Sequence, residues 1–275
     1  MYFRVLGPVH LEFPTGRAHG HVNGSSVRLR GRRQQTILAL LAASLGEVVS
    51  IERIIDSVWP DAEPPLTCRK QVQNCTAAVR RAIQSLETGS ASKEVAILSE
   101  PGGYRLVAPH SSVDAYFFEA RVRDVLQHVA GRMSDAERRT ALAEALKLWF
   151  GSPFAGIESA ELRAEGDRLE ELRMLAIEET VRLDLKDSHT PALHAADLFA
   201  LTQRHPYRER LWLLHMDALR LSGRSAEALA RYNVYRDKIV EELGVEPSQR
   251  MKEKQREILR DDQVLAVSLW SDPCA

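Results

Sequence analysis

The hydrophobic pattern of this 275-residue chain changes once, after the polar stretch at 109–112. Before this stretch, short runs with the alternation of strands are mixed with segments of helical spacing, and after it only helical spacing remains. A chain of this length can form two cores of ordinary size. We therefore predict an α+β domain over residues 1–108, an all-α domain over 109–262, and a flexible tail over 263–275.

The first 108 residues predict strands, then three helices, then a hairpin. Ser50 is a candidate N-cap for the second helix, although Arg53 occupies the capping-box position that glutamate usually takes. Gly102 and Gly103 lie at the turn of the hairpin, where we expect Tyr104 to enter the core. Strands are predicted at 2–11, 27–29, 95–98 and 104–107, and helices begin near Arg32, Ser50 and Thr67.

The rest of the chain predicts helices joined by short turns, the arrangement of an α-solenoid. The pair over 208–243, followed by Pro247, is close to the tetratricopeptide pattern of helix, turn, helix and proline. We therefore expect the all-α domain to be tetratricopeptide-like. Helices are predicted at 114–129, 134–150, 159–187, 191–205, 207–221, 225–243 and 247–259.

The third predicted helix, over 66–86, contains four basic residues and no acidic residue. Arg, Gln and Asn can hydrogen-bond base edges in the major groove, and Lys and Arg also neutralise phosphates. The small Ala77 would allow close approach, and a helix start capped by Thr67 would favour a phosphate. The apolar stripe predicted to face inward is Val72, Cys75, Val79, Ile83 and Leu86. The predicted DNA-binding residues on this helix are Thr67, Arg69, Lys70, Gln73, Asn74, Ala77, Arg80 and Arg81.

Two further arginines are candidates for DNA contacts. Arg105 follows the turn of the hairpin, and Arg32 belongs to a basic group with Arg28, Arg30 and Arg33 before the first helix. Residues 1–108 hold 13 basic and 9 acidic side chains, whereas 109–275 hold 24 and 29, so only the first part suits a polyanion. A solvated basic surface is the alternative interpretation of the same charges.

The sequence contains no motif that indicates an enzyme or a membrane protein. The common nucleophile, phosphate-loop, dinucleotide and zinc-protease motifs are missing, and the histidines lack metal-ligand spacing, so we expect no catalytic residue, cofactor or metal. No apolar run is long enough to span a membrane, and the start does not resemble a signal peptide. Three cysteines without a paired spacing favour a reduced cytoplasm, with Cys68 and Cys75 as core fillers.

Several motifs of the chain resemble the Streptomyces antibiotic regulatory proteins, and the resemblance extends from about residue 3 to about 259. Two departures concern the third helix: Thr76 stands where the family usually has an aliphatic residue, and Ala78 stands where many members carry arginine or a small residue. The motifs that resemble the family are at 31–35, 46–50, 56–60, 71–74, 79–83 and 101–106, followed by 114–119, 145–149, 168–173, 205–211 and 242–248.

The resemblance implies a winged helix-turn-helix DNA-binding domain followed by a bacterial transcriptional activator domain, in the small form of the family. It implies a sequence-specific activator of a secondary-metabolite, or antibiotic, gene cluster. Such a protein binds double-stranded promoter DNA at direct repeats near the −35 region, as a dimer or multimer. It also engages the RNA polymerase holoenzyme through its sigma factor and other subunits.

A protein-interaction scaffold without DNA-binding activity is the alternative, because tetratricopeptide-like arrays mainly bind proteins or peptides. The N-terminal part separates the two hypotheses. A scaffold has no need of an acid-free basic helix followed by a hairpin, whereas a DNA-binding protein uses both.

Overall fold

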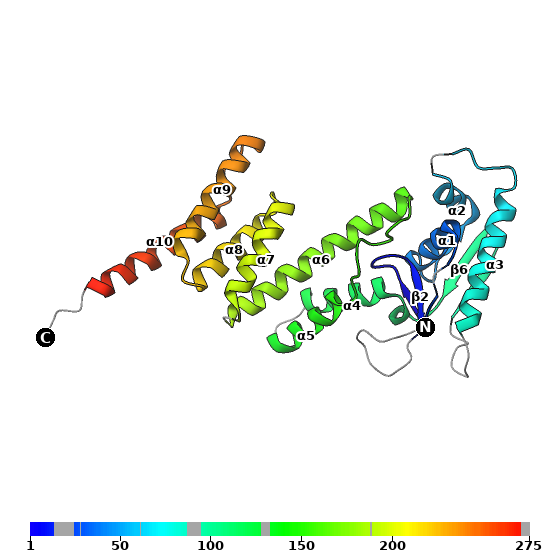
Figure 1. Ribbon diagram of the computed structural model, residues 1–275, viewed down its shortest axis with the longest axis horizontal. Helices are drawn as coiled ribbons and strands as arrows, with labels where there is room; N and C mark the ends of the chain where they lie inside the picture. The colour runs from blue at the N-terminus through cyan, green and yellow to red at the C-terminus, as the bar shows by residue number, and fades with distance from the viewer. Residues whose placement is uncertain are drawn as a thin grey trace. The chain divides into compact units, whose positions relative to one another are not determined.

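The protein is described by a computed structural model that covers residues 1–13, 25–27, 29–60, 62–86, 95–127, 133–187 and 189–270. It is helix-rich with two small antiparallel sheets (Figure 1). The chain divides into two compact units, residues 1–176 and 177–275. This division differs from the predicted domain boundary at 108, which stays a prediction.

The first sheet is antiparallel, in the order β1 (Tyr2–Arg4), β2 (His10–Phe13) and β3 (Ser25–Val27). The prediction of one strand over 2–11 is wrong, because the segment between β1 and β2 leaves the sheet. Pro8 has no N–H to donate to a strand ladder. The carbonyls of Val5 and Leu6 instead accept hydrogen bonds from the backbone N–H groups of Phe154 and Phe150, both at 2.9 Å.

Three helices follow, α1 (Arg32–Ala43), α2 (Ile51–Val58) and α3 (Cys68–Leu86). The predicted N-cap is confirmed, since the Ser50 hydroxyl accepts a hydrogen bond from the Arg53 backbone N–H at 3.1 Å. The predicted hairpin is also present. It pairs with a short strand that was not predicted, and the second sheet has the order β4 (Val48–Ser50), β6 (Gly103–Val107) and β5 (Ala96–Glu100).

The buried face of α3 differs from the predicted stripe at one position. Val72, Val79 and Ile83 are buried, but Thr76 is fully buried as well, and Cys75 is only half-buried. The hydroxyl oxygen of Thr76 has no hydrogen-bond partner among the described residues. The side chain of Leu86 lies outside them.

We expect Thr76→Val to raise the free energy of unfolding by about 1 kcal/mol, because a buried hydroxyl without a partner is replaced by a methyl group of similar size. Urea unfolding followed by circular dichroism measures the change. Thr36→Val in α1 is the matched control. Thr36 is also buried, but its hydroxyl donates to the Arg32 carbonyl at 3.0 Å, so that variant should gain no stability. A loss of stability in Thr76→Val would contradict the interpretation.

A short 3₁₀ turn, His110–Ser112, leads into α4 (Asp114–Leu126), which is held against the N-terminal strand. The buried carboxylate of Asp114 accepts hydrogen bonds from the backbone N–H groups of Val5, at 2.9 and 3.1 Å, and Leu6, at 3.2 Å. Burial raises the pKa of Asp114 to about 7, and these hydrogen bonds oppose the shift. The Tyr116 hydroxyl donates to the Ala43 carbonyl at 2.9 Å, so α4 also holds the end of α1.

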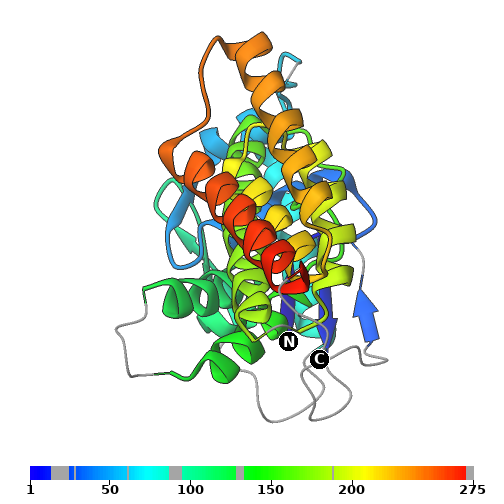
Figure 2. The same cartoon turned by 90° about the vertical axis from the view of Figure 1, so that its left-hand side faces the viewer.

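The helices predicted after residue 112 are all present, and their bounds agree with the prediction to within a few residues at most ends. After α4 they are α5 (Asp135–Leu146), α6 (Ala160–Lys186), α7 (Pro191–Arg204), α8 (Glu209–Leu221), α9 (Ser225–Leu243) and α10 (Gln249–Trp270). α10 differs most, because its helical backbone continues to Trp270, through part of the segment predicted to be a tail; residues 271–275 lie outside the described residues. α8 packs against α7 and α9, and α10 packs against both α9 and α8 (Figures 1 and 2).

Candidate nucleic-acid interface

The outward face of α3 carries the side chains that were predicted to contact DNA. The helix buries Val72, Val79 and Ile83 on the other side, against α1 and α2, so most of its polar positions are turned to solvent. Arg80 alone of the predicted set on this segment is half-buried. The exposed residues are Thr67, Arg69, Lys70, Gln73, Asn74, Ala77 and Arg81.

Within this face, the side chains of Lys70, Gln73 and Asn74 make no hydrogen bond or ion pair with any described residue. Arg69 forms an ion pair with Glu52 of α2 at 2.6 Å and keeps 64% of its side chain exposed. The pKa of Glu52 is lowered by a hydrogen bond from its own backbone N–H and then by Arg69. An exposed pair of this kind contributes little to stability, so a phosphate can replace Glu52 as the partner of Arg69.

Arg80 differs from the neighbouring residues because N–H groups of its guanidinium are already hydrogen-bonded within the protein. Its guanidinium donates to the Ile97 carbonyl and to the Ser99 hydroxyl, both at 2.9 Å, and lies 5.6 Å from the centre of the Tyr104 ring. These partners belong to β5 and β6. Arg80 therefore joins α3 to the hairpin, whereas the exposed Arg81 donates only weakly to the Ala77 carbonyl, at 3.4 Å.

The hairpin beside α3 turns at Gly102, whose φ of +80° lies in the left-handed region that favours glycine. Tyr104 is buried, as predicted. Arg105 forms an ion pair with Glu100 across the hairpin, and its Nε is buried without a hydrogen-bond partner among the described residues. A DNA contact by Arg105 would therefore need Glu100 to release it.

The basic group before α1 is also engaged by the protein. Arg32 forms an ion pair with Glu158 at 2.6 Å and remains 56% exposed. Arg33 donates to the side-chain carbonyl of Gln71 on α3, and its guanidinium lies 5.0 Å from the Trp59 ring centre. Arg28 lies outside the described residues.

The start of α3 is fixed by a contact that the sequence did not predict. The Gln71 side-chain amide donates to the Thr67 hydroxyl at 3.0 Å, while its carbonyl accepts from Arg33. A chain of side-chain contacts thus runs from α1 to the first turn of α3. Periodicity along one helix carries no signal for such contacts, because they depend on how two helices pack.

Metal-ligating side chains do not cluster in the described part of the chain. No group of three or more His, Cys, Asp or Glu side chains that could hold a metal ion occurs among the described residues. Cys68 and Cys75 are free thiols, and burial raises the pKa of the Cys75 thiol although Arg33 opposes the shift. The described helices also include none that is long and apolar enough to cross a membrane.

Comparison with known proteins gives matches along almost the whole chain. Residues 113–259 match the family described as bacterial transcriptional activator domain. The regulatory protein DnrI of Streptomyces peucetius is 34% identical over 268 residues, which cover 95% of this chain and 93% of DnrI. The transcriptional regulator RedD of Streptomyces coelicolor is 32% identical, with 98% of this chain and 74% of RedD covered.

Two longer relatives share only part of their length with this chain. The regulatory protein AfsR of Streptomyces coelicolor is 32% identical over 96% of this chain, which corresponds to 25% of AfsR. The solved structure of Mycobacterium tuberculosis EmbR in complex with a low affinity phosphopeptide superposes with a TM-score of 0.80 at 25% identity. That match covers 94% of this chain and 65% of the EmbR chain.

Proposed function

Because the chain belongs to the family of Streptomyces antibiotic regulatory proteins, we propose that it is a DNA-binding transcriptional activator of an antibiotic gene cluster. We propose that residues 1–108 form a winged helix-turn-helix domain, with α3 in the major groove and the β5–β6 hairpin as the wing. Residues 109–262 form the activator domain in this proposal. The protein has no proposed enzymatic activity and acts in the cytoplasm.

The observation that carries the proposal is the exposed, acid-free face of α3. Lys70, Gln73 and Asn74 have no partners among the described residues, and Arg81 makes only a weak contact with its own helix. Amide side chains can pair with adenine edges, and basic side chains with guanine edges or phosphates. The small Ala77 lies between them and leaves room for the helix to approach the bases.

The contacts of Arg80 and Arg105 give them a second role in this proposal. Arg80 holds the hairpin against α3 and so sets the position of the wing relative to the helix, whereas the ion pair of Arg105 with Glu100 stabilises the wing itself. We propose Arg69, Lys70, Gln73, Asn74 and Arg81 as direct DNA contacts. Thr67 and Arg32 remain proposed phosphate contacts.

The partners of the protein follow from the family. We propose that protomers bind direct repeats near the −35 region of a promoter as a dimer or multimer. The activator domain then engages RNA polymerase, including its sigma factor. DNase footprinting on a promoter with one of the two repeats deleted tests the repeat requirement, since a single repeat should be protected only weakly.

Arg81→Ala tests the DNA-binding face directly. Promoter fragments are first selected by capture of genomic DNA on the full chain, and their affinity is then measured at several salt concentrations. If Arg81 neutralises one phosphate, the slope of log affinity against log salt falls in magnitude by about 0.9. The slope falls because the variant releases one counterion fewer when it binds DNA.

Arg204→Ala is the matched control, because it removes one exposed arginine from α7, far along the chain from α3. Its slope should equal that of the unchanged protein. Equal slopes for all three proteins would show that Arg81 does not neutralise a phosphate. Failure of the full chain to capture any DNA would favour the alternative of a protein-interaction scaffold.

A further inference from the structure

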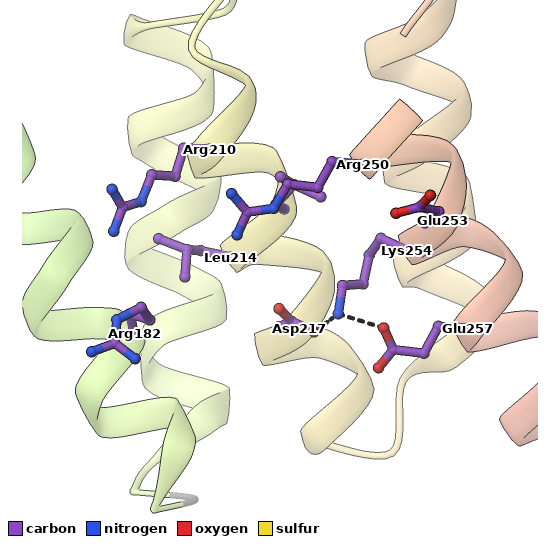
Figure 3. Close-up of a pocket in the computed structure, with 9 residues that line it drawn as sticks. Arg182, Arg210, Leu214, Asp217, Arg250, Glu253, Lys254 and Glu257 are labelled. Atoms are coloured by element: carbon purple, nitrogen blue, oxygen red, sulfur yellow. Dashed lines mark hydrogen bonds and ion pairs between the residues drawn. The ribbon is translucent and has the colours of Figure 1, made fainter. Parts of the chain in front are cut away.

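The second unit contains a cavity of about 260 Å³ that is lined by side chains of α6, α8 and α10 (Figure 3). These are alternate helices of the array, so the cavity lies on the face built by every second helix, where repeat arrays usually bind their ligands. We refer to it as the arginine cavity. It is lined by Arg182, Arg210, Leu213, Leu214, Asp217, Arg250, Glu253, Lys254 and Glu257.

Two of its arginines are anchored by carboxylates that do not line the cavity. Arg182 forms an ion pair with Glu179 at 2.9 Å, and Arg210 lies 3.4 Å from Glu178 and 3.2 Å from Glu179. Both glutamates are buried. These buried partners fix the guanidinium groups in place, so a ligand would meet donors that are already oriented.

The third arginine has no such partner. Arg250 is exposed on α10, and its side chain forms no hydrogen bond or ion pair with any described residue. Figure 3 shows its side chain extending from α10 toward α8, with Arg210 and Arg182 on either side of Leu214. Its positive charge is therefore available to a ligand in the cavity.

The remaining lining limits the charge and size of that ligand. Lys254 forms ion pairs with Asp217 at 3.0 Å and Glu257 at 2.7 Å, so its charge is already compensated, as the charges of Arg182 and Arg210 are by Glu178 and Glu179. The lining carries four basic and three acidic side chains, a balance that disfavours a polyphosphate. The volume also falls below the usual range of pockets that enclose a drug-sized molecule, roughly 300–1,000 Å³.

From these features we propose that the arginine cavity binds a carboxylate side chain of an acidic peptide segment, presented by a protein partner. Arginine pairs with a carboxylate through two parallel hydrogen bonds, which gives both strength and orientation. Leu213 and Leu214 offer apolar surface to the methylene groups of the bound side chain. Because only one charged group enters, the rest of the peptide stays outside the cavity.

The experiment is a titration of the full chain against a short fluorescent peptide, acetylated and amidated, in which Glu alternates with Gly. Fluorescence anisotropy gives its affinity, and a peptide with Gln in place of Glu is the control for charge. We expect Arg250→Glu to weaken binding about tenfold or more, because it removes charge-assisted hydrogen bonds and adds repulsion. Arg256→Glu makes the same charge change at an exposed position of the same helix outside the cavity.

The proposal is supported if the protein binds the Glu peptide and does not bind the Gln peptide, and if this binding is lost in Arg250→Glu but retained in Arg256→Glu. Equal losses in the two variants would overturn it, since they would indicate attraction by general charge. Absence of binding, or displacement of the peptide by inorganic phosphate at concentrations at which acetate has no effect, would also overturn it. Gel shifts with the captured promoter fragments serve as a separate readout, because Arg250→Glu should leave DNA affinity unchanged whatever the peptide does.

Discussion

Gly103→Ala should lower the free energy of unfolding by about 3 kcal/mol or more, since an added methyl group would overlap backbone rather than a side chain that can move. A Cβ atom at Gly103 would lie 2.2 Å from the Val49 carbonyl oxygen and 2.9 Å from its carbon. Gly103 pairs with Ser50 in the β4–β6 ladder. Relief of the overlap requires the two strands to separate, which would displace the hairpin and the N-cap of α2 together.

Gly102→Ala is the control for this prediction, because it changes the adjacent residue with a different physical cost. Gly102 has φ +80°, and no atom lies within 4 Å of the added Cβ, so only the left-handed backbone conformation is penalised, by about 1 kcal/mol. Urea unfolding and promoter affinity are measured for both variants. Equal destabilisation would contradict the prediction, because Gly103 has no left-handed φ and the close approach to Val49 would then be relieved at little cost.

Arg208→Met is expected to destabilise the protein by about 3 kcal/mol, because it leaves a buried carboxylate poorly compensated. Glu178 is only 1% exposed and forms ion pairs with Arg208 and, at 3.4 Å, with Arg210. Methionine keeps much of the apolar volume of the arginine stem. The measured loss would therefore report the uncompensated charge more than lost packing. Thermal or urea unfolding followed by far-ultraviolet circular dichroism gives the change.

The double variant Glu178→Leu with Arg208→Met removes the buried charge together with its partner. It should recover a large part of the stability that Arg208→Met loses, because well-packed apolar residues often replace a buried ion pair without cost. Additive losses from the two single substitutions would contradict the proposed coupling. The comparison needs no assumption about DNA or peptide binding.

The helices and their buried faces were the most predictable part of the fold. From residue 114 onward, apolar spacing and short turns located each helix, because every helix must bury one face against its neighbours. The hairpin and the N-cap at Ser50 were equally local, since they depend on residues close together in sequence. Strand β4 was not predicted, because its three residues form a strand only through their pairing with β6.

The candidate site was predictable as a surface but not residue by residue. The absence of acidic residues from α3 located the exposed face that contains Lys70, Gln73 and Asn74. The sequence could not indicate that Glu52 pairs with Arg69, or that Arg80 is committed to Ile97 and Ser99. Those partners lie 17 to 19 residues away along the chain and come together only through tertiary packing.

The Asp114 carboxylate has a consequence for exchanging DNA specificity between relatives. Its hydrogen bonds from the Val5 and Leu6 amides make the segment that follows β1 depend on a residue that lies beyond the hairpin. A chimera joined at residue 108 would combine an N-terminal strand from one parent with an Asp114 from the other. Grafts that carry residues 1–176 as one piece keep both halves of this contact from a single parent, and such a junction is the natural choice for transplanting promoter recognition.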